Sequence, residues 1–424
     1  MQDSGRPRIV VIGAGFGGIE AAKALHAVAA DVIVVDRQNH HCFQPLLYQV
    51  ATAALSPADV AWPIRHMLAH QQNATVLMEE VRAIDIKARV VQKRDLPIAY
   101  DYLVIATGAT DSYFGHDNWA TFAPGLKGID DATRTRRRIL LAFERAEASD
   151  DDAERQRLLT FAIVGGGPTG VEMAGAIAEI ARQTLKPDFR RIDPRTARIL
   201  LLEAGPRLLP ALSEKLSAYA ETTLRKMGVE VRTSSPVTNC HQHGIEVAGH
   251  FMPVGTIIWA AGVVATPVAA WTGAAHDRAG RILVNADLSL PDAPDVFVVG
   301  DAASVTASPG KLVPGLAAAA KQMGRYVGNV IATRVRGEPP PAAFHYRHQG
   351  DLATIGRRVA VVSLKRLLLT GFPGWLFWSV VHIYFLIGLR SRLAVALNWA
   401  WQYVTFQRGA RLITGVDARN DEWP

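Results

Sequence analysis

The stretch that decides the fold is RIVVIGAGFGGIEAAKAL, residues 8–25. It opens with apolar, β-branched residues, continues through Gly13-x-Gly15-x-x-Gly18, and ends in an alanine-rich helical pattern. The next apolar run, DVIVVD, ends at Asp36, eighteen residues after Gly18. In such a unit the glycines permit a tight turn and a close approach to a pyrophosphate, and the acid accepts hydrogen bonds from ribose hydroxyls. The stretch therefore predicts a dinucleotide site and an α/β fold with a parallel sheet.

The same pattern occurs a second time. LTFAIVGGGPTGVEMAGAIAEIA gives a strand, Gly165-x-Gly167-x-x-Gly170 and a helix, and Glu203 ends the following strand, ARILLLE. The acid comes later than usual, so we predict that residues 182–196 extend the helix and add a loop. Two complete units predict two Rossmann-like domains and two dinucleotides. A flavin with a nicotinamide is the favoured pairing, because it gives the electrons an acceptor.

The composition is that of a globular protein. The chain has 424 residues, enough for two or three domains, and is 49% hydrophobic and 20% charged. Cys42 and Cys240 stand far apart without a C-x-x-C motif, which excludes a disulfide scaffold and argues against a dithiol centre. CHQHG (240–244) and HYRH (345–348) lack a partner cluster, so we predict no metal site. The N-terminus, MQDSGRPR, has no apolar core, and no signal peptide is expected.

The net charge of +7 is concentrated near the C-terminus. Between Leu352 and Val416 there is no Asp or Glu, and four of the nine tryptophans lie there. The basic residues of this stretch are Arg357, Arg358, Lys365, Arg366, Arg390, Arg392, Arg408 and Arg411. Basic residues beside apolar, Trp-rich runs suit a membrane surface better than a phosphate backbone. We therefore predict a contact with the lipid bilayer surface and no nucleic-acid partner.

Further strand-end motifs complete a pattern that resembles a known family. They are YDYLVIATGAT (100–110), TIIWAAGV (256–263) and DVFVVGDAA (295–303), typical of the two-dinucleotide-binding flavoproteins. Within that superfamily the chain resembles the type II NADH dehydrogenases, which are single-subunit NADH:quinone oxidoreductases. The stretches that carry this resemblance are NHHCFQPLLYQVATAALSPADVAWPIR (39–65), GGGPTGVE (165–172), PGLAAAAKQMGRYVGN (314–329) and the basic tail. Together they extend over nearly the whole chain.

The resemblance implies FAD in the first glycine loop and NADH, as substrate, in the second. The residues implied for FAD are Gly13, Gly15, Phe16, Gly17, Gly18, Asp36, Arg37, Ala106, Thr107, Gly108, Asp301, Lys321 and Gln322, with Asp301 on the ribityl chain. Those implied for NADH are Gly165, Gly167, Pro168, Thr169, Gly170, Glu172, Glu203, Ala261 and Gly262.

A helix is predicted to begin at the alanine-rich stretch behind Pro314. Proline suits a first helical turn, where no amide hydrogen is needed, and alanine propagates a helix. By resemblance this helix points its N-terminus at the pyrimidine edge of the flavin. The positive end of the helix would there stabilise the negative charge of the reduced ring.

The resemblance also supplies candidates for electron transfer to a membrane quinone. Gln49, Ala318 and Gln322 are implied for the quinone site, although Ala318 stands where many relatives have a glutamine. Glu172 and Gln322 are the implied catalytic residues. Hydride transfer requires orientation rather than a nucleophile, but a quinone must also collect protons, and Glu172 could relay one. The alternative for Glu172 is a favourable charge in a first helical turn.

Glu203 is predicted to select the nicotinamide nucleotide. A carboxylate at this strand end accepts hydrogen bonds from ribose hydroxyls and repels a 2′-phosphate, which favours NADH over NADPH. Arg207 follows four residues later and would weaken that preference if it turned back toward the site.

We predict a discontinuous FAD domain (1–112 and 266–344), an NADH domain (113–265) and a membrane-anchoring C-terminal region (345–424). The apolar run Leu367–Leu389 is interrupted by glycines and a proline, which leaves a helix over 375–389. About 22 Å of helix is too short for about 30 Å of hydrocarbon. The next segment, 393–406, is amphipathic, with Leu393, Leu397, Trp401 and Val404 on one stripe. A monotopic anchor on the cytoplasmic face of the inner (plasma) membrane is favoured over a spanning helix or a soluble dimer interface, and a homodimer is possible.

Two other functions compete with a respiratory enzyme that does not pump protons. One is a soluble NADH-dependent flavoprotein reductase that acts on a protein acceptor such as a ferredoxin. The other is a non-catalytic, NADH-binding flavoprotein sensor. The acid-free, Trp-rich tail argues against the soluble reductase, which would gain little from such a surface. Sulfide:quinone reductases share the fold but rely on cysteines, and two isolated cysteines do not supply a sulfur relay.

Overall fold

The computed structural model describes residues 5–308, 310–365, 367–405 and 407–414. The chain forms two compact units, each assembled from three separate segments. The first unit comprises Met1–Cys42, Trp62–Thr110 and Val263–Gln349. The second unit comprises Phe43–Ala61, Asp111–Gly262 and Gly350–Pro424.

A six-stranded sheet forms the core of the first unit, in the order β20-β21-β9-β1-β2-β5. All neighbouring strands are parallel except β20 and β21. The central strand β1 is buried on both faces, which is why its sequence is an uninterrupted apolar run. The strands are β1 (Arg8–Ile12), β2 (Asp31–Asp36), β5 (Ala74–Met78), β9 (Tyr102–Ile105), β20 (Ser289–Leu290) and β21 (Ala293–Val298).

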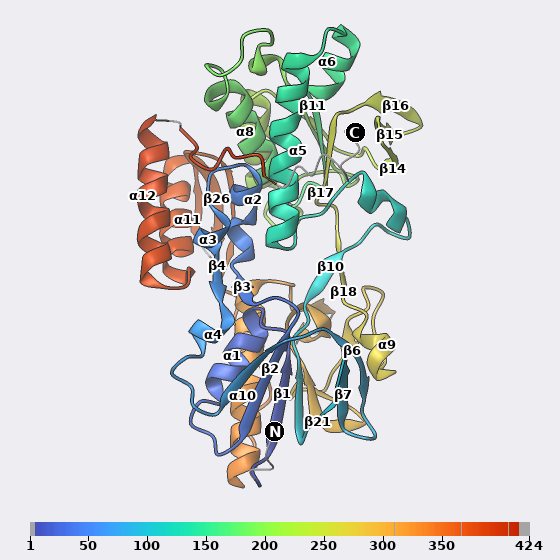
Figure 1. Ribbon diagram of the computed structural model, residues 1–424, viewed down its shortest axis with the longest axis vertical. Coiled ribbons are helices and arrows are strands. Elements are labelled where there is room, and N and C mark those ends of the chain that lie inside the picture. Colours follow the sequence, from blue (N-terminus) through green and yellow to red (C-terminus); the bar gives the residue numbers. More distant parts are fainter. Residues whose placement is uncertain (1–4, 309, 366, 406, 415–424) are drawn as a thin grey trace. The chain divides into compact units, whose positions relative to one another are not determined.

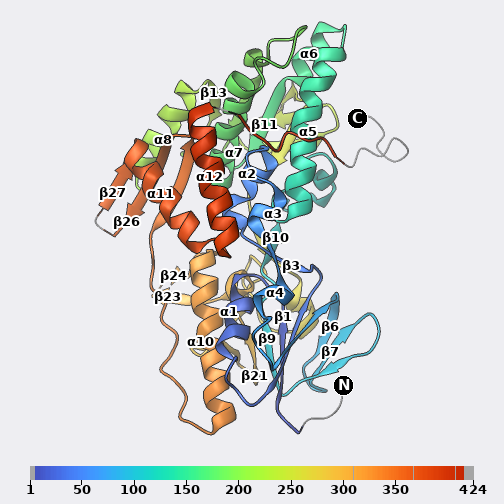
Figure 2. The ribbon, with the colours of Figure 1, turned by 60° about the vertical axis from the view of Figure 1, so that its left-hand side comes forward.

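Two helices of the first unit, α1 (Phe16–Ala24) and α10 (Ala317–Arg336), pack closely on one another (Figures 1 and 2). Glycines make this possible: a Cβ on Gly324 would lie 2.0 Å from the carbonyl oxygen of Gly17. One expectation is corrected here. The helix begins at Ala317, so Pro314 precedes it rather than occupying its first turn. The reason is local, since Leu316 has extended backbone and its N–H donates to the carbonyl of Pro314 (2.9 Å).

The remaining elements of the first unit are short. They are α4 (Ile64–Met67), α9 (Val268–Thr272), the antiparallel sheet β6 (Val81–Asp85), β7 (Val90–Lys93) and β8 (Ile98–Ala99), and the pairs β19 (Ile282–Leu283) with β22 (Ala303–Ser304) and β23 (Thr306–Ser308) with β24 (Lys311–Leu312). Short strands also lie where the chain enters or leaves a unit: β3 (His40–Cys42), β4 (Ala61–Pro63), β10 (Ala109–Asp111) and β18 (Val263–Ala265).

The second unit contains a four-stranded parallel sheet in the order β13-β12-β11-β17. Its strands are β11 (Thr160–Val164), β12 (Arg198–Leu202), β13 (Val229–Arg232) and β17 (Thr256–Trp259). The helices are α5 (Ile129–Ala148), α6 (Asp152–Leu158), α7 (Pro168–Glu179) and α8 (Glu214–Lys226), and a small antiparallel sheet adds β14 (Val237–His241), β15 (Gly244–Val247) and β16 (His250–Pro253). A π-helix over Ile180–Thr184 extends α7 and a loop follows, which confirms the predicted delay before Glu203.

The C-terminal segment builds on the second unit. It forms the antiparallel sheet β25 (Asp351–Gly356), β26 (Val359–Leu364) and β27 (Leu367–Thr370), then α11 (Gly371–Phe385) and α12 (Leu389–Thr405), near α2 (Leu47–Ala51) and α3 (Pro57–Val60). Strand β25 covers α7 so closely that a Cβ on Gly175 would lie 1.7 Å from the carbonyl oxygen of Ile355. The predicted domain boundaries stay a prediction. The structure adds that residues 43–61 and the C-terminal segment pack with the second sheet.

The helix expected over 375–389 was placed four residues too late. In the structure α11 starts at Gly371 and ends at Phe385. Pro373 lies in the first turn, where a proline removes no intrahelical hydrogen bond, so it does not interrupt the helix. Within the described residues, no helix is both long and apolar enough to span a bilayer.

Candidate active site

The first glycine loop has the geometry of a dinucleotide cradle. Gly13 has φ 92°, and a Cβ there would lie 2.4 Å from the carbonyl oxygen of Ala106. A Cβ on Gly18 would lie 1.8 Å from the carbonyl oxygen of Gly13, so α1 starts directly against the loop. Gly15 instead faces open space, with no atom within 4 Å of its would-be Cβ. Gly13 and Gly18 thus serve close packing, whereas Gly15 leaves the backbone accessible to a phosphate.

Asp36 and His41 brace this loop. The Asp36 carboxylate accepts from the N–H of Ala14 (2.6 Å) and of Gln38 (2.7 Å). His41 Nδ1–H donates to the carbonyl of Ala14 (2.8 Å), and its ring meets Phe16 edge-on at 4.9 Å. Burial lowers the pKa of His41 to about 4, so the imidazole is neutral at neutral pH. His41 therefore supports the loop.

A pocket lies at the start of α10, where the resemblance places the flavin. It encloses about 490 Å³ of empty space, part of it open to solvent. Its lining includes Gly300, Asp301, Gly315, Ala319 and Met323. The loop and this pocket are neighbours within the unit, since a Cβ on Gly17 would lie 3.0 Å from the side chain of Val299 and 3.3 Å from the carbonyl of Ala320. These residues fit a dinucleotide that runs from the glycine loop to α10.

The other residues implied for FAD stand around the same loop or on α10. Thr107, which follows β9 beside Ala106, shares a hydrogen bond with Thr266 (2.6 Å between hydroxyl oxygens). Gly108 adopts φ 70°, and Arg37 is exposed just after Asp36. Lys321 and Ala318 are partly buried on α10, and burial lowers the pKa of Lys321.

Gln322 is engaged within the first unit. Its amide Nε2 donates to the carbonyl of Arg347 (3.0 Å), and its Oε1 accepts from the N–H of Arg347 (2.9 Å). The side chain thus ties the segment after α10 back to the helix. Its contact with a quinone stays a prediction.

The second glycine loop repeats the geometry of the first. A Cβ on Gly165 would lie 2.4 Å from the carbonyl oxygen of Ala260, and one on Gly170 would lie 1.8 Å from that of Gly165. Gly167 faces open space and caps α7, whose first residues are Pro168 and Thr169. The loop therefore offers the same accessible backbone at the N-terminus of a helix.

Glu203 occupies the strand-end position of the second cradle. Its carboxylate accepts from the N–H of Gly166 (2.5 Å) and of Gly205 (2.6 Å). Arg207 does not turn back toward it, because its guanidinium donates to the carbonyls of Leu212 and Pro210, both at 2.8 Å. Arg207, which could otherwise accommodate a 2′-phosphate, is therefore held by backbone carbonyls of the residues that follow it.

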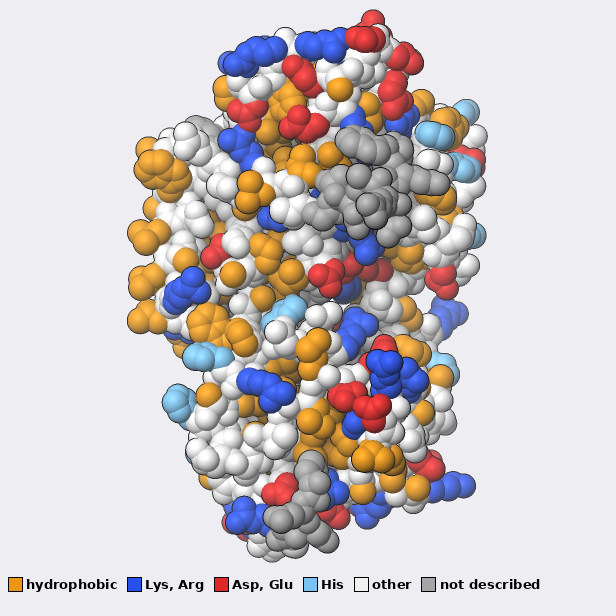
Figure 3. All heavy atoms as spheres, viewed as in Figure 1, with side chains coloured by type: hydrophobic (Ala, Val, Ile, Leu, Met, Phe, Trp, Pro, Cys, Tyr) orange, Lys and Arg blue, Asp and Glu red, His pale blue; other side chains and the backbone are white. Residues whose placement is uncertain are grey.

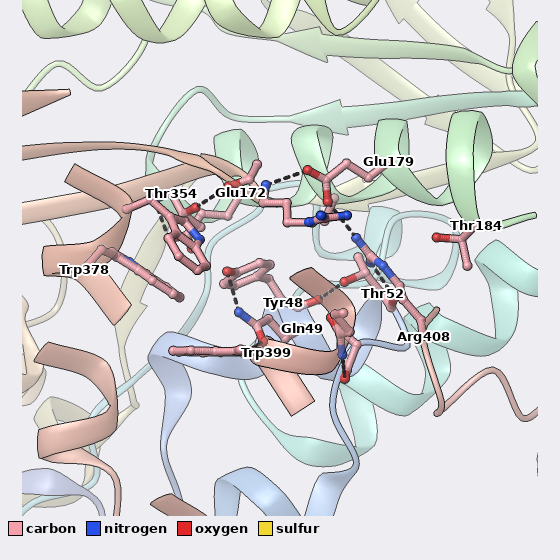
Figure 4. A pocket seen from close by; sticks show the side chains of 16 residues that line it. Tyr48, Gln49, Thr52, Glu172, Glu179, Thr184, Thr354, Trp378, Trp399 and Arg408 are labelled. Carbon is pink, nitrogen blue, oxygen red and sulfur yellow. Dashed lines mark hydrogen bonds and ion pairs between the residues drawn. The ribbon is translucent and has the colours of Figure 1, made fainter. Parts of the chain in front are cut away.

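A second pocket, about 690 Å³ of partly open space, surrounds Glu172 (Figure 4). It is lined by Tyr48, Gln49, Thr52, Ala54, Glu172, Ala176, Glu179, Thr184, Thr354, Gly356, Arg357, Trp375, Trp378, Trp399, Gln402 and Arg408. A row of hydrogen bonds crosses it: Trp399 Nε1 donates to Gln49 Oε1 (2.7 Å), and Gln49 Nε2 donates to Tyr48 Oη (2.8 Å). The structure thus brings Glu172 and Gln49 together, whereas Ala318 and Gln322 belong to the first unit.

Glu172 has the electrostatics of a proton-carrying group. Its carboxyl oxygen Oε1 accepts from the N–H of Thr354 at 3.3 Å. Burial raises the pKa of Glu172 to about 8, and the Thr354 N–H lowers it only in part. Burial, and then the charge of Glu172, also raises the pKa of Tyr48. A carboxyl that is protonated at neutral pH can give up and recover a proton during a reaction.

One buried ion pair was not anticipated. Arg408, which we grouped with the basic residues of a membrane surface, is buried and pairs with Glu179 at 3.0 Å. It also donates to the carbonyl of Thr52 (2.7 Å), so the segment after α12 is fixed to α7 and α2. A guanidinium at 8% exposure needs such partners, but the sequence contains no signal for a pairing over this separation.

The cysteines and histidines do not form a further centre. Burial raises the pKa of Cys42 and of Cys240 to about 12, so both thiols are protonated. The part of the chain that the structure describes contains no cluster of three or more His, Cys, Asp or Glu residues placed to hold a metal ion.

Comparison with known proteins identifies the family and close relatives of this chain. The model of the family described as pyridine nucleotide-disulphide oxidoreductase matches residues 7–324. The type II NADH:quinone oxidoreductase NdhA of Mycobacterium tuberculosis is 45% identical over 427 residues, covering 97% of this chain and 90% of the relative. The type II NADH:quinone oxidoreductase Ndh of the same organism is 43% identical over 428 residues, covering 97% and 91%.

A solved structure supports the fold. The NDH2 from Plasmodium falciparum in complex with NADH matches with a TM-score of 0.86 at 21% identity, over 97% of this chain and 100% of that one. At this identity the match speaks for the fold alone.

Proposed function

Because the chain belongs to the pyridine nucleotide-disulphide oxidoreductase family, and within it to the type II NADH:quinone oxidoreductases, we infer that it is a respiratory enzyme that oxidises NADH and reduces a membrane quinone. Its cofactor is FAD, and the transfer pumps no protons. The observation that carries this assignment is the presence of two cradles with matching geometry, each with its own strand-end acid.

We assign FAD to the first cradle and NADH to the second. When bound, the flavin accepts a hydride and passes on two electrons. The chain's own contribution is to bind and orient the two nucleotides. Gly15 and Gly167 leave the backbone N–H groups accessible to the pyrophosphates. Asp36 and Glu203 are placed to accept hydrogen bonds from the ribose hydroxyls. Asp301 and Gly315 line the pocket at α10 that suits the ribityl and flavin portion.

The pocket around Glu172 is our candidate for the quinone head and its proton. Its wall combines aromatic faces, from Tyr48, Trp378 and Trp399, with the amide of Gln49 and the carboxyl of Glu172. Flat rings with a few polar groups suit a ring that carries two carbonyl oxygens. In this arrangement Glu172 holds the proton that the reduced quinone needs.

An anaerobic experiment with purified protein separates the three candidate functions. NADH is added under nitrogen, the visible absorbance of the flavin is followed, and a short-chain quinone is then injected. We expect rapid bleaching and complete recovery on the addition of quinone. A reductase for a protein acceptor would bleach but recover slowly, and a sensor would keep a long-lived NADH complex without bleaching. Either result would overturn the assignment.

We further propose that α11, α12 and β27 present a surface to the lipid bilayer. Figure 3 shows hydrophobic side chains gathered over α12. The exposed apolar residues on these elements are Leu367, Leu368, Phe372, Leu376, Val380, Tyr384, Phe385, Leu389, Leu393, Leu397, Trp401 and Val404. The predicted stripe of α12 is thus exposed, while Val395 and Trp399 fill the opposite, buried face. Such an exposed set on paired helices marks an interaction surface, and Arg390 beside it favours an anionic lipid face.

We place this surface on the cytoplasmic face of the inner (plasma) membrane, with the helices lying in the interface. Ending the chain near Ala343 would not test it cleanly, because that removes β25, which covers α7. Point variants are sharper. The wild type should sediment with anionic vesicles even at high salt, because its apolar contacts are not screened by salt. Leu393→Gln with Leu397→Gln and Trp401→Gln should abolish this sedimentation even at low salt and leave reduction of a water-soluble quinone intact.

A matched control replaces an exposed phenylalanine elsewhere in the second unit, Phe251→Gln, which should leave vesicle binding unchanged. Sedimentation equilibrium without lipid tests the alternative, a homodimer through the same surface. A concentration-dependent dimer that the triple variant dissolves, without any change in vesicle binding, would replace the membrane assignment.

A further inference from the structure

Phe114 combines an unfavourable backbone with an exposed ring. Its φ is 54°, in the left-handed region that a large side chain rarely adopts. Leu209 and Leu288 share this conformation, with φ 48° and 66°, but both are buried, at 1% and 0% exposure, so packing holds them there. Phe114 is 66% exposed. Burial therefore does not account for the conformation of Phe114, and such outliers concentrate at functional sites.

The loop that carries Phe114 is anchored by the two residues that precede it, Ser112 and Tyr113. Tyr113 stacks on Trp259 at 5.1 Å, and its hydroxyl donates to the carbonyl of Ala123 (2.8 Å). Trp259 Nε1 donates to the carbonyl of Ser112 (2.8 Å), and the N–H of Ser112 donates to the carbonyl of Gly262 (3.1 Å). These contacts fix the direction in which the Phe114 side chain leaves the backbone.

The ring lies beside the second cradle. A Cβ on Gly262 would come within 2.8 Å of Cζ of Phe114, so the ring rests against this glycine. Gly262 follows Ala260 and Ala261, the residues that contact Gly165 of the glycine loop: a Cβ on Gly165 would lie 2.4 Å from the Ala260 oxygen and 2.6 Å from Cα of Ala261. Phe114 therefore stands at the end of β17, one contact removed from the loop.

The sheet order decides which part of the nucleotide faces the ring. β11, which leads into the glycine loop, lies between β12 and β17. Glu203 directly follows β12 and marks the adenosine side, because the strand-end acid binds the adenosine ribose. The pyrophosphate lies at the loop, so the other half of the dinucleotide extends toward β17.

We propose that Phe114 covers the nicotinamide ring of bound NADH and NAD⁺, holding it flat and shielding it from water. This rests on the assignment of NADH to the second cradle. An exposed aromatic ring gains contact area and stacking when a planar ring settles beside it, and a dry site favours hydride transfer. The strained φ of Phe114 is the feature that aims the ring at this position.

Calorimetric titration of the oxidised holoenzyme with NAD⁺ and with ADP-ribose, which lacks only the nicotinamide, tests the contact directly. Phe114→Ala should weaken NAD⁺ binding about 5- to 150-fold, the range of a lost stacking contact, and leave ADP-ribose binding unchanged. Phe251→Ala, another half-exposed phenylalanine of the second unit, is the matched control and should change neither. Equal loss for both ligands, or no loss for either, would overturn the role of Phe114. If the wild type bound neither ligand, the assignment of the second cradle itself would fail.

A double-mutant cycle separates the ring from general disruption of the loop. Gly262→Ala adds a methyl group that would lie 2.8 Å from Cζ of Phe114 and therefore displaces the ring. It should therefore weaken NAD⁺ binding in the wild type and have almost no effect in Phe114→Ala. Additive losses would contradict the proposal.

Phe114→Gly should unfold at a higher temperature than Phe114→Ala while binding NAD⁺ as weakly, because glycine relieves the strained φ. If Phe114→Gly kept wild-type NAD⁺ affinity, the ring would not be the covering group.

Discussion

The two glycine loops of this chain are nearly identical in local geometry. A Cβ on Gly13 or on Gly165 would lie 2.4 Å from a carbonyl oxygen of the neighbouring strand end, and one on Gly18 or Gly170 would lie 1.8 Å from the loop. In both, the strand-end acid binds two backbone N–H groups. The repetition shows that one arrangement of strand, loop, first helical turn and neighbouring strand end forms both cradles.

The difference lies two residues past the third glycine, where each helix carries a glutamate. In the first unit Glu20 pairs with Arg325 of α10 at 2.7 Å. In the second unit Glu172 meets the N–H of Thr354 in β25, and no cation lies within 4 Å of its carboxylate among the described residues. The element that covers the helix therefore decides the chemistry of the glutamate. A helix supplies a neutralising arginine, whereas a strand supplies one N–H, which leaves burial to raise the pKa.

Replacing the third glycine of each cradle should produce the largest effects and separate the two sites. Gly18→Ala should abolish FAD retention, because its Cβ would overlap the Gly13 oxygen and the backbone must move. Gly170→Ala should retain FAD but weaken NADH binding by about 100-fold or more. The flavin content of purified protein and the NADH dependence of flavin bleaching measure the two losses.

The middle glycines give the matched control. A Cβ on Gly15 or Gly167 meets no protein atom within 4 Å, so both alanine variants should fold and, compared without nucleotide, should match the thermal stability of the wild-type apoprotein. Each should still lose its own nucleotide, since the methyl group occupies the path of the pyrophosphate. If Gly15→Ala kept full flavin, the first cradle would not bind FAD in the assigned way.

Replacing Glu172 or Glu20 with glutamine should give the next largest difference in rate. We expect only the Glu172 variant to be slowed. Glu172→Gln removes the protonatable group, so reoxidation of the flavin by quinone should slow by about 100-fold, a usual contribution of general acid catalysis. In the wild type this step should slow as pH rises through about 8, because burial raises the pKa of Glu172 to that value. Glu20→Gln should leave both half-reactions unchanged. Stopped-flow traces over a pH series decide this, and equal slowing in both variants would refute it.

The raised pKa of Glu172 also predicts how stability depends on pH. The unfolded chain loses the proton near pH 4.5, whereas the folded protein keeps it until about pH 8. Between these values the folded state binds one more proton, so the free energy of unfolding falls as pH rises. Glu172→Gln should remove this slope. Denaturant titrations across the window measure it, and parallel curves for both proteins would contradict the burial of this carboxyl.

The two glycine loops and their strand-end acids were predictable from the sequence, whereas the segments that pack over α1 and α7 were not. Gly13, Gly18, Asp36 and their second-unit counterparts follow from the spacing of the glycine motif and the strand-end acid, although Gly13 and Gly165 also pack against the distant residues Ala106 and Ala260. The extension before Glu203 was likewise readable as a polar stretch without strand periodicity.

The contacts that make Glu172 unusual join distant segments instead. Thr354 lies 182 residues from Glu172, and Arg408 lies 229 residues from Glu179. No spacing rule connects them, and the burial of Arg408 runs against its charge. The row from Trp399 through Gln49 to Tyr48 was missed for the same reason, although a tryptophan among polar residues on a helix was a usable hint. Phe114 had no signal at all, since a positive φ is not encoded by its residue type.

The strand-end acids allow an intermediate prediction. Glu203→Gln should raise the use of NADPH relative to NADH by about 5- to 150-fold, because repulsion of a 2′-phosphate and a charged acceptor are both lost. Arg207→Ala in the same background should change the ratio little, as its guanidinium is held by Leu212 and Pro210. Ratios of kcat/KM for the two nucleotides measure this. An unchanged ratio in Glu203→Gln would remove Glu203 from the specificity site.

The smallest effect concerns the arginine that distinguishes the first helix from the second. Arg325 is 68% exposed and Glu20 is 13% exposed, so their attraction is largely screened by solvent. Arg325→Met should lower the free energy of unfolding by at most about 1 kcal/mol, the range of exposed pairs, and the loss should shrink at high salt. Adding Glu20→Gln should recover part of it, because the unpaired carboxylate is then gone. Urea titrations of the four proteins in the cycle, at low and high ionic strength, give the coupling. A coupling of several kcal/mol that salt does not change would mean that Glu20 lies in a site as dry as that of Glu172. The helix α10 that covers Glu20 would then differ from the strand β25 that covers Glu172 only in the partner it offers to the carboxylate, and not in how well it excludes water from that carboxylate.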